Sequence, residues 1–86
     1  MQIYFPTVVE RDETEIYCAE VVGNAINGQG PTLASALDDA AKSLQEVIWW
    51  SVEQGEDVPT PQEPTELEAG RGIVALLQVT VPAQAA

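Results

Sequence analysis

The sequence contains no histidine and a single cysteine, Cys18, among its 86 residues. One thiol cannot form an internal disulfide, and a chain without histidine or a cysteine cluster does not have the ligands of a structural zinc site. Cys18 also has no histidine to activate it as a nucleophile, so we interpret it as a small apolar residue of a strand. We therefore expect no metal, no cofactor and no thiol chemistry.

Basic residues are also scarce. Arg11, Lys42 and Arg71 are the only three, against 14 acidic residues, and the formal net charge is −11. Binding of nucleic acid requires several lysines or arginines to neutralise phosphates, so we reject direct binding of DNA or RNA. An acidic surface suits a basic partner protein through electrostatic steering, but the same charge is also what keeps a small protein in solution without any such partner. Composition leaves these two interpretations open.

Long apolar runs are missing as well, and none approaches the roughly 20 residues that a membrane span needs. The N-terminal segment 1–6 lacks the basic start of a signal peptide, and the thiol is free, so we expect a cytoplasmic protein. Hydrophobic residues make up 45% of the chain, which is a globular composition. We expect one domain over residues 1–82, a frayed tail over 83–86, and stabilisation by assembly into a homodimer or homotetramer.

The hydrophobic pattern predicts four strands and one long helix in the order β-β-β-α-β. The strands are expected at 3–10, 15–22, 25–29 and 72–81, and the helix at 33–54. One helix can cover only one face of a sheet, so we predict an α+β fold with a small, mostly antiparallel sheet. The last strand is the most apolar and is expected at the centre of the sheet. Residues 55–69 are rich in proline and acid and are expected to form an extended, solvated loop.

The helix has clear boundary signals. Thr32 is a good N-cap and Gly55 a natural stop, although Ser35 stands where a capping box would carry glutamate or glutamine. Pro6 lacks an N–H for a sheet ladder, so it should lie at an edge or on a free side of the first strand. The apolar stripe of the helix follows the 3–4 spacing of a core-facing surface: Leu33, Leu37, Ala40, Ala41, Leu44, Val47 and Ile48.

Apolar side chains occur on both faces of the predicted strands, and the helix covers only one of them. The uncovered face predicts self-association or a partner. Trp49 and Trp50 both lie off the core-facing stripe, so at least one is expected to anchor an interface, although either could instead fold back over the sheet edge. The predicted oligomer interface comprises five residues: Trp49, Trp50, Tyr17, Val74 and Leu76.

Three segments resemble the motifs of one family in the same order. Gly30-Pro-Thr-Leu-Ala-Ser-Ala-Leu-Asp-Asp-Ala40 resembles the G-D-T-x-E-E-A-L-x-x-A signature of HicB-like antitoxin domains, where it also follows a short strand and opens the single helix. Glu53-Gln-Gly-Glu-Asp-Val-Pro-Thr-Pro61 looks like that family's E-D-G-E-P-I-P-x-P helix exit. Tyr4-Phe-Pro-Thr-Val-Val-Glu-Arg-Asp12 is similar to its first strand, Y-P-A-V-I-E.

The resemblance implies a partly degenerate RNase H-like domain that binds and blocks a small basic toxin, a HicA-like mRNA interferase. It implies common assembly as dimers or tetramers. The sequence ends one strand after the helix, so we expect it to lack the C-terminal DNA-binding domain of many members. The acidic residues that we expect to meet the toxin are Glu10, Asp12, Glu13 and Glu20.

Nuclease activity and a scaffolding role are the two alternatives to toxin binding. RNase H chemistry needs several carboxylates that converge on two metal ions. Glu10 and Asp12 are predicted at a hairpin tip, and the chain has too few cations to hold a nucleic acid, so we predict that the protein is not an enzyme. The remaining alternative is a solitary, self-assembling RNase H-like scaffolding domain with no toxin partner.

Overall fold

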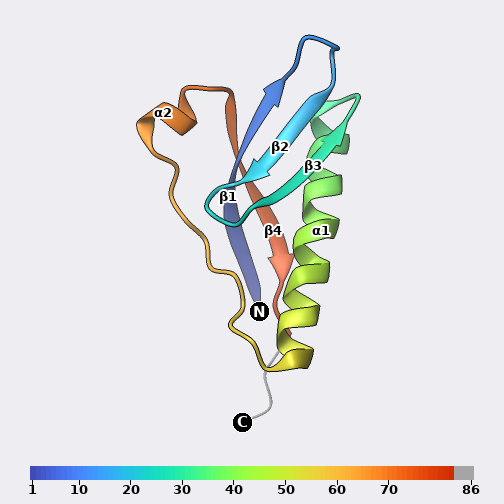
Figure 1. Ribbon diagram of the computed structural model, residues 1–86, viewed down its shortest axis with the longest axis vertical. Helices are drawn as coiled ribbons and strands as arrows, with labels where there is room; N and C mark the ends of the chain where they lie inside the picture. The colour runs from blue at the N-terminus through green and yellow to red at the C-terminus, as the bar shows by residue number, and fades with distance from the viewer. Residues whose placement is uncertain (83–86) are drawn as a thin grey trace.

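Four strands and two helices make up the computed structural model, which describes residues 1–82 (Figure 1). The predicted tail 83–86 lies outside the described residues. The elements, in chain order, are β1 (Gln2–Arg11), β2 (Tyr17–Val21), β3 (Ile26–Gly30), α1 (Leu33–Gln54), α2 (Glu66–Ala69) and β4 (Ile73–Thr80). The predicted strands and the long helix are all present, within two residues of the expected bounds.

The strands form one antiparallel sheet in the order β3-β2-β1-β4. Helix α1 lies along one face of it, against β3 and β2 and then across the end of β4 (Figure 1). The predicted α+β class is confirmed. The predicted central position of the last strand is wrong, because β4 is an edge strand and β1 lies between β2 and β4. The apolar run of β4 reflects partial burial: Leu77 is buried and Leu76 is exposed.

Pro6 stands inside the central strand rather than in an edge strand. It pairs with Leu76 of β4, and on its other side the β1–β2 ladder begins only at Thr7 and Val21. The Val22 N–H donates to the Pro6 carbonyl over 3.0 Å. The Val22 carbonyl, which an N–H at position 6 would otherwise reach, accepts from Asn24 Nδ2 at 3.0 Å. The Asn24 side chain therefore supplies the donor that Pro6 lacks at the end of the β1–β2 ladder.

The boundaries of α1 follow the predicted signals. The Ser35 N–H donates to Thr32 Oγ1 over 3.1 Å, and the Thr32 N–H donates to Ser35 Oγ over 3.0 Å. This is a reciprocal capping box in which serine takes the place of the usual glutamate or glutamine. At the other end Gly55 adopts a left-handed conformation with φ 70°, which suits glycine and stops the helix.

The core lies between α1 and the sheet face beneath it, called here the inner face. Phe5 and Val21 come from the strands, and Leu44 and Ile48 come from the helix; all are fully buried. Val47, predicted on the buried stripe, is exposed, whereas Ala36 and Ser51 are buried. The Ser51 hydroxyl donates to the Val47 carbonyl over 2.8 Å, so its polar group is satisfied inside the helix.

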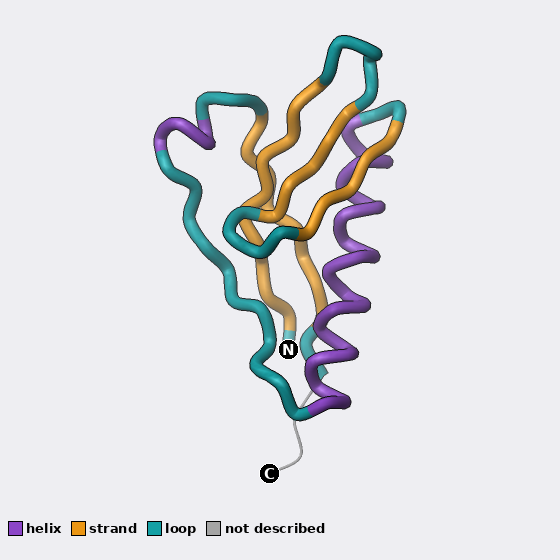
Figure 2. The backbone as a smooth tube through the Cα atoms, in the orientation of Figure 1, coloured by secondary structure: helices purple, strands orange, loops and turns teal. Residues whose placement is uncertain are grey.

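The segment that returns from α1 to β4 is more structured than predicted. It runs the length of the molecule beside the sheet (Figure 2) and contains the short helix α2. Val58 packs against the core, and the Thr60 carbonyl accepts from Asn24 Nδ2 at 3.2 Å. Thr65 and Glu68 form a second capping box. The segment expected to be solvated is thus held to the core by Val58 and to the turn between β2 and β3 by the Thr60–Asn24 hydrogen bond.

Candidate binding surface

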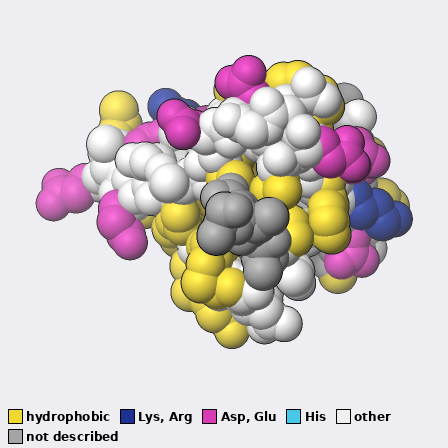
Figure 3. Space-filling model, turned by 90° about the horizontal axis from the view of Figure 1, so that it is seen from below, with side chains coloured by type: hydrophobic (Ala, Val, Ile, Leu, Met, Phe, Trp, Pro, Cys, Tyr) yellow, Lys and Arg dark blue, Asp and Glu magenta, His cyan; other side chains and the backbone are white. Residues whose placement is uncertain are grey.

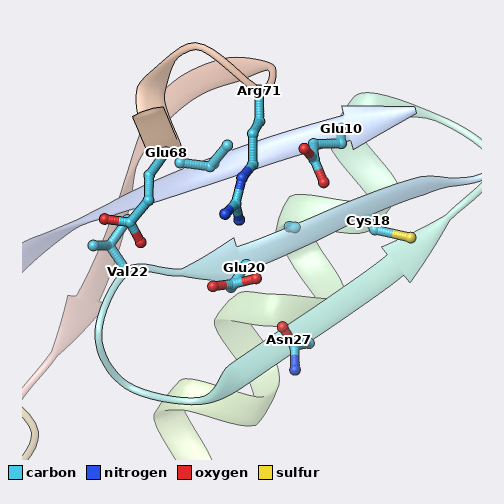
Figure 4. Close-up of a pocket in the computed structure, with 9 residues that line it drawn as sticks. Glu10, Cys18, Glu20, Val22, Asn27, Glu68 and Arg71 are labelled. Atoms are coloured by element: carbon cyan, nitrogen blue, oxygen red, sulfur yellow. The ribbon is translucent and has the colours of Figure 1, made fainter. Parts of the chain in front are cut away.

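The sheet face away from α1, called here the outer face, carries the candidate site. The register places Glu10 beside Cys18 and Val8 beside Glu20 on this face, and Glu20 beside Asn27 on β3. Val8 and Val22 also lie here and are nevertheless buried. They share a hollow with Glu68 and Arg71, because the α2 segment lies over this part of the sheet (Figure 4). The outer face is therefore partly covered, and the expectation of a fully open second face is corrected.

This acidic hollow is shaped by three carboxylates around one cation. Glu10 and Glu20 rise from β1 and β2, and Glu68 and Arg71 approach from the α2 segment (Figure 4). Its volume is about 60 Å³, well below the roughly 300–1,000 Å³ of small-molecule sites. An opening of this size fits the tip of one side chain from another protein. Its acidic rim favours a lysine or an arginine.

Glu68 has two roles in this hollow. It accepts from the Thr65 N–H over 3.0 Å as part of the capping box. That backbone hydrogen bond, the Thr65 side chain and the charge of Arg71 together hold the pKa of Glu68 below its ordinary value. The carboxylate thus stays ionised down to a lower pH than an isolated glutamate and helps keep the hollow acidic.

The other two predicted partner-binding acids lie at the β1–β2 hairpin tip. Asp12 Oδ1 accepts from the Thr14 hydroxyl at 2.7 Å, from the Thr14 N–H at 2.8 Å and from the Ile16 N–H at 3.0 Å. These bonds, the Thr14 side chain first, lower the pKa of Asp12. Glu13 is exposed beside it. The structure thus divides the four acids into two pairs, Glu10 with Glu20 in the hollow and Asp12 with Glu13 at the tip.

Tyr17 does not share a surface with the other predicted interface residues of the sheet. Its partner in the register is Gly30, and its half-buried side chain packs against the core on the inner face. Arg11 extends over its ring, with the guanidinium carbon 5.9 Å from the centroid, and also pairs with Glu15 at 3.2 Å. Val74 and Leu76 lie on the opposite face, so one flat interface cannot contain all three residues.

The remaining predicted interface residues are exposed. Leu76 is 63% exposed on the outer face, where Val74 and Tyr4 accompany it. Trp49 and Trp50 are 47% and 56% exposed on α1, as their positions off the helical stripe predict. Whether any of these residues contacts another protein stays a prediction.

Sequence reasoning missed Glu68 and Arg71, which complete the hollow. Glu68 belongs to the segment 55–69 that was interpreted as a solvated loop, and Arg71 lies between that segment and the last predicted strand. A signal was present: Thr65 followed three residues later by Glu68 is the capping-box pattern that opens a helix. That pattern would have placed a helical turn next to β4 and brought both residues near the sheet.

A second depression lies at the lower end of the molecule, where β1 starts and β4 ends. Its volume is about 430 Å³, and it is bounded by Met1, Ile3, Val58, residues 59–61, Val81 and Pro82. Seen from this end, hydrophobic side chains gather in the middle and lower part of the face, and acidic side chains lie around its periphery (Figure 3). This depression is apolar and open, and it lacks the charged groups of the acidic hollow.

Within residues 1–82, no three acidic or cysteine side chains are grouped so that they could hold a metal ion. In the same part of the chain, neither helix combines the length and the apolar character required to cross a membrane.

Two solved structures share this architecture. The N-terminal domain of Burkholderia pseudomallei antitoxin HicB aligns with a TM-score of 0.77 and 22% sequence identity, over 94% of this chain and 100% of that one. Burkholderia pseudomallei antitoxin HicB aligns with a TM-score of 0.76 and 20% identity, over 98% of this chain and 69% of that one. No protein-family model and no curated protein matches the sequence. The chain thus has the fold of the HicB N-terminal domain, as its three motifs imply.

Proposed function

We propose that this protein is an antitoxin-type binding module that sequesters a small basic mRNA-interferase toxin in the cytoplasm. The observation that carries the proposal is the likeness of fold, over 94% of the chain, to a domain of an antitoxin. The net charge of −11 adds to it, because an acidic protein attracts a basic partner and accelerates its association. Neither observation requires catalysis by this chain.

The acidic hollow is the part of the surface that we assign to the toxin. Glu10 and Glu20 are exposed, and within residues 1–82 neither forms an ion pair with the nearby Arg71, so their oxygens are open to a donor from another protein. A lysine or arginine that enters between them would find a floor of Val8 and Val22 for its aliphatic stem. Asp12 and Glu13, at the hairpin tip, act at longer range as steering charges.

A scaffolding role is the second candidate. The exposed apolar residues of β4 favour it, because a small domain with an uncovered strand gains stability when it assembles with copies of itself. In that case the protein forms homodimers or homotetramers, and its acidic charge serves solubility only.

Co-expression with the protein encoded by the neighbouring gene separates these functions. Native mass measurement of the purified material should reveal a complex of both chains, and this chain should rescue growth from the toxicity of its neighbour. A neighbour that is small, basic and toxic by itself strengthens the expectation. If no complex forms and growth is not rescued, the antitoxin proposal is wrong and the scaffolding role gains support.

A further inference from the structure

The free edge of β4 carries unpaired backbone groups. At Thr80 both backbone groups point away from β1: Gln45 Nε2 donates to the Thr80 carbonyl over 2.6 Å, and the Thr80 N–H donates to Gln45 Oε1 over 3.1 Å. Successive residues of a strand alternate in direction, so the N–H and C=O groups of Val74, Leu76 and Gln78 point the same way. Within residues 1–82, nothing pairs with these groups.

Elsewhere, α1 occupies parts of both sheet edges. At β3 the Gln29 N–H donates to Asp39 Oδ2 over 3.0 Å. At the end of β4, the side-chain amide of Gln45 pairs with both backbone groups of Thr80, as a neighbouring strand would. The stretch from Ile73 to Val79 is left without such cover, and it is the longest open edge that residues 1–82 present.

The uncovered stretch is apolar on both faces. Ile73 is 53% exposed on the inner face, and Val74 and Leu76 are exposed on the outer face. No charged residue occurs between Ile73 and Val81. Sheet proteins usually protect an edge with lysine, proline or a bulge, and β4 has none of these. An unprotected edge of this kind is suited to pair with another strand.

We propose that β4 pairs antiparallel with β4 of a second copy, so that the two sheets join across a twofold axis at Leu76. In this register Leu76 faces Leu76 of the second copy, and Val74 faces Gln78. Each pair exchanges two backbone hydrogen bonds. The ladder between the two copies ends before Thr80, because the backbone groups of Thr80 are already paired with the Gln45 side chain. Ile73 of one copy lies beside Val79 of the other and gains cover on the inner face.

Charge identifies the occupant as a second copy rather than a basic protein. Self-association of a chain with net charge −11 is opposed by repulsion, so a self-interface belongs on a part of the surface without acids. The segment 73–81 is such a part, and it also carries the open edge. A basic partner gains no electrostatic attraction there, whereas the acidic hollow offers Glu10 and Glu20. This inference does not depend on the antitoxin proposal, and either one can fail alone.

Cysteine cross-linking tests the register. In a Cys18→Ser background, Leu76→Cys brings two thiols together at a hydrogen-bonded pair, where the Cα atoms lie about 5.5 Å apart, within disulfide range. Under mild oxidation this variant should form a covalent dimer. Val74→Cys alone should not, because its copies lie roughly 13 Å apart at about 3.4 Å per residue. A mixture of Val74→Cys and Gln78→Cys chains should cross-link. Equal cross-linking of all single variants would overturn the register.

A matched pair of leucine substitutions tests the interface. Leu76→Lys places a charge at the centre of the proposed ladder without removing a hydrogen bond inside the chain. Leu67→Lys makes the same change on α2, where the leucine is 76% exposed. Sedimentation at micromolar concentration should give a dimer for the wild type and Leu67→Lys, and a monomer for Leu76→Lys with an unchanged circular dichroism spectrum.

Two outcomes would contradict the proposal: a wild-type monomer, and a dimer that survives Leu76→Lys. If the wild type is a monomer and its binding to the neighbour-encoded protein is lost in Leu76→Lys, the edge belongs to the partner. Loss of the dimer with intact binding of that protein supports both proposals as separate surfaces.

Discussion

Gly28 of β3 lies directly against the backbone of Ala40 in α1. A Cβ atom at position 28 would stand 2.2 Å from the Ala40 backbone nitrogen and 2.6 Å from the Ala36 carbonyl oxygen. Backbone atoms cannot move aside as the end of a side chain can. The absence of a side chain at Gly28, together with the small side chains of Ala36 and Ala40, therefore lets α1 approach the sheet closely.

Gly28→Ala should therefore destabilise the fold strongly. Insertion of a methyl group into such a contact forces the helix away from the sheet, and overpacking of a core costs about 1–3 kcal/mol or more. Denaturant unfolding should show this loss. Gly70→Ala is the control: Gly70 has φ −73°, which alanine adopts readily, and should change the free energy of unfolding by less than about 1 kcal/mol. Equal effects of the two substitutions would refute the close-contact argument.

The capping box of α1 makes a second stability prediction. Thr32→Ala removes the acceptor for the Ser35 N–H and should lower the free energy of unfolding by about 1 kcal/mol, the usual cost of losing an N-cap. Ser43→Ala, in the interior of the same helix, removes a hydroxyl without a hydrogen bond in the described residues and should have little effect. Thermal denaturation of the two variants tests the difference. A similar melting temperature for both would show that the box contributes nothing.

Low pH should reduce the stability that Asp12 gives to the β1–β2 turn and that Glu68 gives to the start of α2. The pKa values of Asp12 and Glu68 are lowered in the folded protein by hydrogen bonds from Thr14 and Thr65. The folded state then binds their protons less tightly than the unfolded state, whose values lie near pH 4. Their contribution to stability is present above about pH 4 and is lost as the pH falls through the folded-state values.

The comparison must be between variants, because protonation also relieves the repulsion of a chain with net charge −11. Denaturant unfolding of the wild type and of the double variant Asp12→Asn, Glu68→Gln should be measured from pH 7 to pH 3. The difference in the free energy of unfolding should be largest at pH 7 and shrink toward pH 3. A difference that does not depend on pH would contradict the assignment.

The long helix was predictable from sequence because its signals are local. Thr32 and Gly55 mark its ends, and the spacing of Leu37, Leu44 and Ile48 marks its buried side. Strand order has no such local signal. The apolar run of β4 indicated a central strand, yet its position depends on which neighbours it meets in space. Leu76 is exposed on the edge strand and Leu77 is buried under α1, yet both are leucines, so the sequence does not distinguish them.

Of the four charged residues of the acidic hollow, the sequence pointed to Glu10 and Glu20 but not to Glu68 and Arg71. Glu10 was expected at the hairpin tip with Asp12, which is wrong, because β1 extends to Arg11 and pairs Glu10 with Cys18 inside the ladder. Once the strand bounds are known, alternation places Glu10 and Glu20 on the same face. Glu68 and Arg71 reach the hollow only because the 55–72 segment runs back along the sheet, which is a tertiary contact. The capping pattern at Thr65 was the one local clue, and proline-rich composition obscured it.

The two tryptophans should behave differently in self-association. Trp49 lies one helical turn after Gln45, whose amide touches the edge of β4, so Trp49 faces the side on which a second copy would dock. Trp50 lies about 100° further around the helix, away from that edge. Trp49→Ala should weaken an observed dimer more than Trp50→Ala, as measured by sedimentation at several concentrations. If neither variant weakens it, the tryptophans do not anchor the interface.

Charge reversal on the outer face tests where a basic partner docks. Glu10→Lys with Glu20→Lys should reduce the association rate with the neighbour-encoded protein by at least about tenfold at low salt, because close charge pairs govern steering. Glu46→Lys with Glu53→Lys changes the net charge equally on the exposed side of α1 and is the matched control. Stopped-flow or biosensor rates over a range of salt concentrations distinguish the two pairs. Equal losses would mean that only the total charge matters, whereas a selective loss for the first pair places the basic partner at the acidic hollow.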